Sequence, residues 1–282
     1  MSNAPLVLIG SRGMLGRAFF NEFARRGRPF TPLNREQLDL SKPEDLALAI
    51  PPRTRIVINC AAWTNVDKAE EHEAEATMVN GEGLGALAHT CAEMGAILVN
   101  YGTDYVFRGD ADKPYRTTEK RSPINAYGRS KAAGEAALHQ SGCDYLQIRT
   151  SWLYAPWGTN FVRTINKTAH EKPVLKVVND QRGRPTSAEH LARTTLALLD
   201  EEATGIYHVT DGGECTWFEF AQEIVRLSNA PAKVEPCTTA DFPRPAKRPA
   251  YSVLDISQTE EVVGPMPHWK TNLADVMKRL ET

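Results

Sequence analysis

The sequence predicts a doubly wound α/β fold, in which helices cover both faces of a mostly parallel sheet. Short, continuously apolar runs alternate with longer segments whose apolar residues recur at helical spacing. Strands that are buried on both faces are continuously apolar, whereas half-exposed strands alternate with polar residues. This alternation of buried strands and amphipathic helices is typical of βαβ units.

The first half of the chain supplies these elements in a regular order. Clear strands are expected in PLVLIG (5–10), RIVINCAA (55–62), GAILVNYGTDYVF (95–107) and CDYLQIRTSWLY (143–154), with a weaker one in PFTPLN (29–34). Helical spacing is found at 14–27, 69–94 and 124–138. Because each helix lies between two strands, it can serve as a crossover of a parallel sheet.

After Arg149 the character of the sequence changes. Proline and glycine become frequent, and the expected helices, such as 189–199 and 217–227, are short. We therefore expect a dinucleotide-binding domain at 1–150. Residues 151–282 are expected to form mainly a smaller, interleaved α/β lobe that binds substrate, with some segments returning to the first domain.

Composition excludes several classes of function. The 282 residues carry a net charge of −2 and a pI of about 6.4, so no basic surface for nucleic acid or an acidic membrane is expected. The five cysteines are scattered and form no C-x-x-C pair, and no apolar run reaches the ~20 residues of a membrane helix. We expect a cytoplasmic protein without a signal peptide. The seven histidines form no ligand-spaced cluster, so no metal is expected.

A glycine-rich loop lies between the first strand and the first helix. In VLIGSRGMLGRAFF, Gly10 can make a tight turn, Gly13 can let the backbone approach a pyrophosphate, and Gly16 can let the helix pack on the strand. Met14 and Leu15 begin the helix, whose N-terminus attracts anions. This arrangement predicts a Rossmann-type dinucleotide site.

The next turn suggests which dinucleotide binds. The second strand does not end in the acidic residue that would bind a ribose hydroxyl; Asn34 and Arg35 stand there, and Arg12 lies in the glycine loop. Because arginine can accommodate a 2′-phosphate, NADP(H) is favoured, with NAD(H) as the alternative. Asp39 and Leu40 are placed beside the adenine; a solvated turn is an equal alternative for Asp39.

The helix at 124–138 contains Tyr127 and Lys131, four residues apart and thus on one face. Alone, such a pair most often lies on a solvated surface. Beside a nicotinamide, the phenol can donate a proton to the alkoxide that hydride transfer produces. A cation about 4 Å away contributes roughly 4 kcal/mol at a dielectric constant of 20, so Lys131 is expected to lower the pKa of Tyr127. Thr103, just past a strand, supplies a hydroxyl that can orient the ketone.

Glycine loop, threonine and Tyr-x-x-x-Lys resemble, in order and spacing, the extended short-chain dehydrogenase/reductase family, and most closely its dTDP-4-dehydrorhamnose reductase branch. The segments that carry the closer resemblance are GSRGMLG, VINCAAWTNVDKAE, VN at 79–80, TDYVF, SPINAYGRSKAAGE, RTSWLY, NF at 160–161, DQRGRPTS, GIYHVT and RPAYS. They extend to about residue 255. The resemblance implies NAD(P)H-dependent reduction of the 4-keto group of a dTDP-4-keto-6-deoxysugar, giving dTDP-L-rhamnose.

The same resemblance implies roles for individual residues. Thr103, Tyr127 and Lys131 would be catalytic, and Tyr127 and Lys131 would also contact the cofactor. The backbone near the nicotinamide would be that of Cys60, Ala61, Ala62 and Thr64. The residues that would contact substrate are Thr64, Val66, Thr103, Asp104, Tyr105, Tyr127, Trp152 and Asn160. Arg182 or Arg184 would meet the diphosphate, with a solvated loop as the equal alternative.

Some features differ from the family pattern or leave alternatives open. Gly102 replaces a usual serine, which would remove a hydroxyl beside the site; Arg108 and Tyr251 also depart from the pattern. These changes leave another nucleotide 4-keto sugar as an alternative substrate. A non-catalytic NADP-binding regulatory subunit of the same fold is a further alternative. The resemblance is compatible with a homodimer. Dimers of the family sometimes use magnesium between carboxylates, for which Glu189 is the candidate; an ordinary helix glutamate is the favoured alternative, and no metal is expected.

Overall fold

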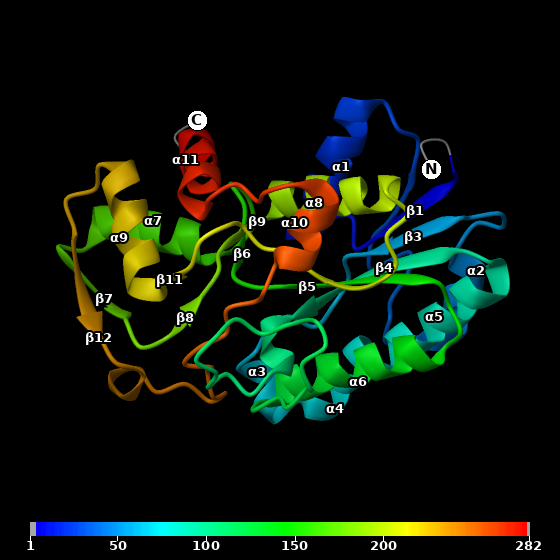
Figure 1. Ribbon diagram of the computed structural model, residues 1–282, viewed down its shortest axis with the longest axis horizontal. Helices are drawn as coiled ribbons and strands as arrows, with labels where there is room; N and C mark the ends of the chain where they lie inside the picture. The colour runs from blue at the N-terminus through cyan, green and yellow to red at the C-terminus, as the bar shows by residue number, and fades with distance from the viewer. Residues whose placement is uncertain (1–3, 281–282) are drawn as a thin grey trace.

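The centre of the molecule is a six-stranded parallel sheet, seen in a computed structural model that describes residues 4–280 (Figure 1). The strand order is β2-β1-β3-β4-β5-β10, and every neighbouring pair is parallel. The strands are β1 (Leu6–Ile9), β2 (Thr31–Leu33), β3 (Ile56–Asn59), β4 (Ile97–Thr103), β5 (Tyr145–Thr150) and β10 (Gly205–His208). The order reverses at β1 and β3, which is where ligands bind in such sheets. The predicted fold class is confirmed.

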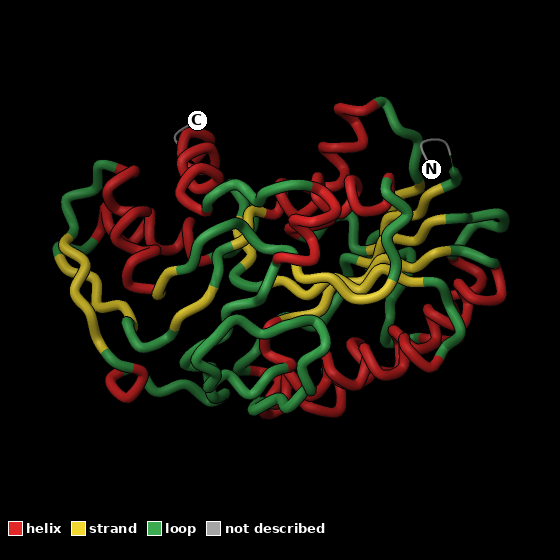
Figure 2. Tube along the Cα trace, viewed as in Figure 1, coloured by secondary structure: helices red, strands yellow, loops and turns green. Residues whose placement is uncertain are grey.

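Helices cover both faces of this sheet, as Figures 1 and 2 show. One face packs against α1 (Met14–Arg26) and α8 (Ala188–Asp200), and the other packs mainly against α5 (Gly83–Met94) and α6 (Ala126–Gln140). Because side chains alternate along each strand, neighbouring residues enter different cores: Leu8 faces α1, and Val7 and Ile9 face the opposite layer.

The helix expected at 69–94 is interrupted. It consists of α3 (Lys68–Glu71), α4 (Glu73–Thr77), the π-helical segment η2 (Met78–Glu82) and α5. The backbone of η2 approaches α6 so closely that a Cβ on Gly134 would overlap the carbonyl oxygen of Asn80. A π-segment inside a helix often marks a functional region, and this one lies beside the helix that carries Tyr127.

The smaller lobe contains three helices around its own apolar core. These are α7 (Phe161–Glu171), α9 (Trp217–Ser228) and α11 (Trp269–Leu280), beside the parallel pair β7 (Val174–Val178) and β12 (Lys233–Cys237). The chain does not stay in this lobe after β5, because α8 packs on α1 and β10 extends the central sheet.

Short elements complete the structure. They are η1 (Pro43–Asp45), α2 (Leu46–Ala49), η3 (Asp104–Val106), β6 (Leu153–Tyr154), β8 (Arg182–Gly183), β9 (Thr186–Ser187), β11 (Cys215–Thr216), η4 (Thr239–Asp241) and α10 (Ser257–Val263). Among residues 4–280, no helix has the length and apolar character needed to cross a membrane.

Candidate active site

The glycine loop packs closely against β3 at the carboxyl edge of the sheet. Gly10 has φ +72°, in the left-handed region, and a Cβ there would come within 2.7 Å of the amide nitrogen of Ala61. A Cβ on Gly16 would overlap the carbonyl oxygen of Gly10. The backbone therefore leaves room only for glycine at these two positions.

The first turn of α1 suits an anion. Gly13 is its N-cap, no side chain caps it, and the turn contains no acidic residue. Its N–H groups and the positive end of the helix dipole are thus available to a diphosphate. Trp157 packs against this turn. Its indole N–H donates a hydrogen bond to the backbone carbonyl of Met14 at 3.0 Å, and the centre of its ring lies 4.7 Å from the guanidinium carbon of Arg17. Leu15 is buried in the core beneath.

The turn after β2 carries the charges expected near a 2′-phosphate. Arg12 and Glu36 form an exposed ion pair at 3.5 Å, and Arg35 pairs with Asp39 at 3.1 Å. Asn34 accepts hydrogen bonds from two backbone N–H groups of the same turn, so it shapes the turn. The side chain of Leu40 is buried in the core of the α5 face.

The loop after β3 lies next to the glycine loop. Cys60 donates its N–H to Ile9, and burial raises the pKa of its thiol. The side chain of Asn80 binds the backbone of Trp63 twice. Its Oδ1 accepts from the Trp63 N–H at 2.9 Å, and its Nδ2 donates to the Trp63 carbonyl at 3.0 Å. Beyond the half-buried Ala61 and Ala62, Thr64 is exposed and Val66 is half-buried. Asn80 was not among the site residues expected from the sequence, although the VN segment at 79–80 is one of those that carry the family resemblance.

Thr103 and Tyr127 come together at the end of β4. Thr103 caps η3 by accepting from the N–H of Tyr105 at 3.2 Å. The rings of Tyr105 and Tyr127 are edge-to-face, 5.9 Å apart. Burial raises the pKa of Tyr127 to about 12, while a hydrogen bond with Thr103 lowers it. The phenol therefore keeps its proton at neutral pH.

Lys131 differs from the expectation. Its Nζ donates to the backbone oxygen of Tyr101 at 2.6 Å, and burial lowers its pKa to about 8, opposed by the charge of Glu135. The groups that shift the pKa of Tyr127 are its own burial, Thr103 and Asp104. The contact of Nζ with the β4 backbone was not expected from the sequence, and the effect of Lys131 on the pKa of Tyr127 stays a prediction.

Asp104 is buried beside these groups with part of its carboxylate unpaired. Its Oδ1 accepts from the hydroxyl of Thr103 at 3.0 Å, and its Oδ2 has no hydrogen-bond partner among the described residues. Burial raises the pKa of Asp104 to about 6, and the Ser252 and Thr103 hydroxyls lower it. A buried acceptor without a partner is costly, so a ligand hydroxyl is a suitable occupant.

Trp152 lies where the central sheet meets the smaller lobe. Its φ is +49°, which is unusual for a residue other than glycine, and its ring stacks on Trp217 with centroids 3.6 Å apart. The ring also abuts Gly183, where a Cβ would lie 2.7 Å from it. Strained backbone of this kind is often found at ligand sites.

The structure shows the contacts of Asn160 and of the two candidate arginines in the smaller lobe. Asn160 caps α7 through Oδ1, and its Nδ2 donates to Ala155 and Trp157, so its amide serves the local backbone and leaves no donor for substrate. Arg182 lies 3.5–3.6 Å from two glutamates, whereas Arg184 has a buried Nε without a partner within the described chain. Of the two arginines, Arg184 is the one with a buried donor that lacks a partner among the described residues.

Gly102 does not face the active site. A Cβ there would lie 2.5 Å from Nε2 of Gln147 and 2.6 Å from Oε1 of Glu135, below α6. Successive side chains along β4 point to opposite faces of the sheet, so residues 102 and 103 face opposite sides. The expectation that Gly102 removes a hydroxyl beside the active site is therefore wrong, because a side chain at this position would meet the ends of the Gln147 and Glu135 side chains.

Two further regions lie outside the active site. Glu189 is bound by the guanidinium of Arg279, with Nη1 donating at 2.7 Å. No group of three or more metal-binding side chains gathers in the described range.

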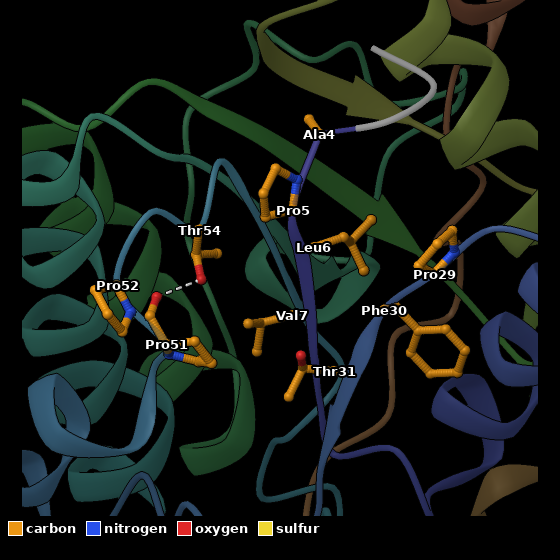
Figure 3. A pocket seen from close by; sticks show the side chains of 10 residues that line it. All are labelled: Ala4, Pro5, Leu6, Val7, Pro29, Phe30, Thr31, Pro51, Pro52 and Thr54. Carbon is orange, nitrogen blue, oxygen red and sulfur yellow. Dashed lines mark hydrogen bonds between the residues drawn. The ribbon is translucent and has the colours of Figure 1, made fainter.

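A hollow of about 420 Å³ is lined by the residues in Figure 3 and lies at the amino ends of β1 and β3, at the edge opposite the active site.

Comparison with known proteins gives consistent matches. The sequence pattern described as the RmlD substrate binding domain matches residues 4–282. A dTDP-4-dehydrorhamnose reductase of Streptomyces griseus is 41% identical and covers 95% of this chain and 91% of its own. A probable dTDP-4,6-dihydroxy-2-methyloxan-3-one 4-ketoreductase of Streptomyces antibioticus is 38% identical, covering 95% and 93%. The crystal structure of the Bacillus anthracis dTDP-4-dehydrorhamnose reductase with NADP is 34% identical, with a TM-score of 0.94 over 99% of this chain and 100% of that one.

Proposed function

The chain belongs to the RmlD substrate binding domain family, and from this premise we propose that it is an NADP(H)-dependent oxidoreductase. It reduces the 4-keto group of a dTDP-4-keto-6-deoxysugar, namely dTDP-4-dehydrorhamnose, to give dTDP-L-rhamnose. The observation that carries this proposal is the approach of Thr103 and Tyr127 at the carboxyl edge of a sheet whose glycine loop suits a diphosphate. NAD(H) is the secondary cofactor.

The cofactor is held at the first turn of α1. The glycine positions leave room for backbone N–H groups to reach the diphosphate, and Arg12 and Arg35 are the cations available to a 2′-phosphate. When bound, the reduced nicotinamide supplies the hydride. Lys131 orients the ribose from α6, and the loop at Cys60–Ala62 limits the space beside the ring.

The protein supplies the proton. Tyr127, with a pKa of about 12, is fully protonated at neutral pH, and an alkoxide is a stronger base than a phenolate. Thr103 orients the keto oxygen, and Oδ2 of Asp104 accepts a sugar hydroxyl. The thymidine diphosphate contributes binding energy that holds the keto carbon in place. Residues 1–150 carry the cofactor, and residues 151–282 contribute mainly to the sugar and nucleotide.

The test is a reaction of the protein with NADPH and dTDP-4-dehydrorhamnose (dTDP-4-dehydro-6-deoxy-L-mannose). The oxidation of NADPH is followed by the loss of its nicotinamide absorbance. Tyr127→Phe should lower kcat by about 10²–10⁴-fold, because the proton donor is removed while ring packing is retained. NADPH bound without turnover on this or any other 4-keto sugar would contradict an enzymatic role. A preference of tenfold or more for NADH would contradict the role of Arg12 and Arg35.

A second substrate is favoured by one specific relative. The Streptomyces antibioticus protein is named for a different dTDP-4-keto sugar, yet it is 38% identical over most of the chain. Comparing kcat/KM for dTDP-4-dehydrorhamnose with that for the dTDP-linked 4,6-dihydroxy-2-methyloxan-3-one, which has one hydroxyl group fewer, decides between the two. The sugar with the larger kcat/KM is the substrate.

A further inference from the structure

A row of buried amide side chains crosses the central sheet beneath α6. Asn59 donates to Asn100 at 2.9 Å, Asn100 donates to Gln147 at 2.8 Å, and Gln147 reaches Oε1 of Glu135 at 3.4 Å. The first three are register partners on β3, β4 and β5, and all four are buried. We call Asn59, Asn100, Gln147 and Glu135 the polar ladder.

The two ends of the polar ladder meet different parts of the active site. At one end, Oδ1 of Asn59 accepts the N–H of Ala61 at 3.1 Å, in the loop proposed to lie beside the nicotinamide. At the other end, Glu135 lies on α6 one turn beyond Lys131. The guanidinium of Arg149 binds both carboxylate oxygens of Glu135, at 2.8–3.2 Å.

A single carboxylate sets the direction of the whole row. An ionised Glu135 can only accept, so Gln147 must present its NH₂ group to it. The carbonyl of Gln147 then receives the NH₂ of Asn100, and the same logic orients Asn59 so that its oxygen faces the N–H of Ala61. Aligned hydrogen bonds of this kind polarise one another in a low-dielectric interior.

We propose that Glu135 is a positioning residue for the reductase reaction: it holds the Ala61 loop through the polar ladder and places a carboxylate one helical turn from Lys131. This inference rests on the proposed function, because the loop and Lys131 matter through the cofactor. The other groups that face Glu135 are Arg149, Arg121 and, across Arg149, the buried imidazole of His208. Gly102 completes the arrangement, since a side chain there would displace Gln147 and Glu135.

A purely structural ion pair would behave differently. Replacing a buried pair often changes stability alone, without altering a titration or a rate. Glu22 offers a matched comparison, because it is a buried carboxylate on α1 that pairs with Arg25 and Arg26 at 2.7 Å, near the end of the helix away from the glycine loop.

The experiment compares the full-length wild type with Glu135→Gln, Glu135→Asp and the control Glu22→Gln. Glu135→Gln should lower kcat by about 100-fold, with a smaller change in KM for the sugar, because displacing a reacting group by about 1 Å costs on that order. The alkaline limb of its pH–rate profile should move to lower pH, because loss of the negative charge favours neutral Lys131. Glu135→Asp should restore the alkaline limb, and Glu22→Gln should leave rate and profile unchanged.

Gln147→Met keeps the ion pair and interrupts the ladder, so it serves if Glu135→Gln does not fold. It should lower kcat and weaken NADPH binding by about tenfold each while leaving the alkaline limb in place. An unchanged kcat and NADPH affinity in Gln147→Met, or an unmoved alkaline limb in a folded Glu135→Gln, overturns the inference. If the wild type fails to oxidise NADPH with the sugar, the proposed function fails, and NADPH affinity alone still decides whether the ladder holds the loop.

Discussion

The two faces of the central sheet are built from different chemistry, although they share the same strands. The face against α1 and α8 is apolar along the strands, with Leu8, Ile58, Val99, Leu146 and Ile148. The face toward α5 and α6 is apolar in its middle, but near the carboxyl edge it carries Asn59, Asn100, Gln147, Arg149 and His208. Within the strands that the structure describes, these polar residues lie in the part of the sheet that approaches the active site.

This difference shows how a fold separates stability from positioning. Apolar packing is non-directional and tolerates other side chains of similar volume. A buried hydrogen bond is directional, and leaving one partner unpaired costs about 1–3 kcal/mol. The apolar face therefore stabilises the sheet, and the polar face fixes where loops and helices stand relative to one another.

The largest expected effect comes from breaking the ion pair on the polar face. Arg149 is 2% exposed, and Glu135 is 4% exposed. Arg149→Met leaves a buried carboxylate without its partner, so the free energy of unfolding should fall by about 3–5 kcal/mol. Urea denaturation measures this change.

The double variant Arg149→Met, Glu135→Leu sharpens the comparison. Removing both charges should recover most of the loss, because no uncompensated charge remains. On the apolar face, Phe19→Ala should cost a similar 3–5 kcal/mol, from the cavity it leaves. A double variant as unstable as Arg149→Met alone would contradict this account.

Acid should weaken the polar face through His208. Burial, and then Arg149, lower its pKa to about 3. In the unfolded chain the imidazole has a pKa near 6.5, so between about pH 6.5 and 3 the unfolded state binds a proton that the folded state does not. The free energy of unfolding should therefore fall by up to about 1.4 kcal/mol per pH unit as the pH drops below about 6. Urea denaturation at several pH values measures this slope.

His208→Gln isolates this contribution from that of the acidic residues. The variant should reduce the dependence of the free energy of unfolding on pH by the contribution of one histidine. The dependence that the acidic residues cause should remain. A variant with the same slope as the wild type would show that His208 titrates normally in the folded protein.

Gly102→Ser tests how tightly the polar face is packed. The added Cβ would lie 2.5 Å from Nε2 of Gln147 and 2.6 Å from Oε1 of Glu135, so both side chains must move. Overpacking of this kind should cost about 1–3 kcal/mol in urea denaturation. Adding Gln147→Ala should not restore full stability, because Glu135 remains in the way. A serine accepted without loss would mean that the network relaxes freely.

The smallest expected effect lies one residue away from the ladder. Ile148 follows Gln147 on β5 but faces α1 and α8. Ile148→Val should cost about 0.5–1.5 kcal/mol through the lost methyl group and leave kcat unchanged. A kcat reduced more than about threefold would show that the apolar face also positions the site.

Much of the fold was readable in the sequence because its signals are local. The buried strands 6–9, 56–59 and 97–103 are continuously apolar, and the glycines at 10, 13 and 16 fall at one strand–helix junction. Tyr127 and Lys131 share a face through helical periodicity alone. These patterns depend on neighbours a few residues apart, which one sequence contains.

The contacts within the site were predicted less well from the sequence, because they join segments that are distant along the chain. Lys131 was expected to act on Tyr127 but donates to Tyr101, and Asn160 was expected to meet substrate but caps α7. Gly102 was assigned to the active site although it faces Gln147 and Glu135. Each outcome depends on a partner brought close by the strand order.

The sequence by itself determined the parallel sheet, the glycine loop and the tyrosine–lysine helix, since periodicity and backbone sterics act over a few residues. Only the tertiary structure decided which polar groups are paired. The buried row from Asn59 to Glu135 joins four elements across the sheet, and no spacing along the chain records that register. Directional bonds between distant residues exist only once the strands are aligned.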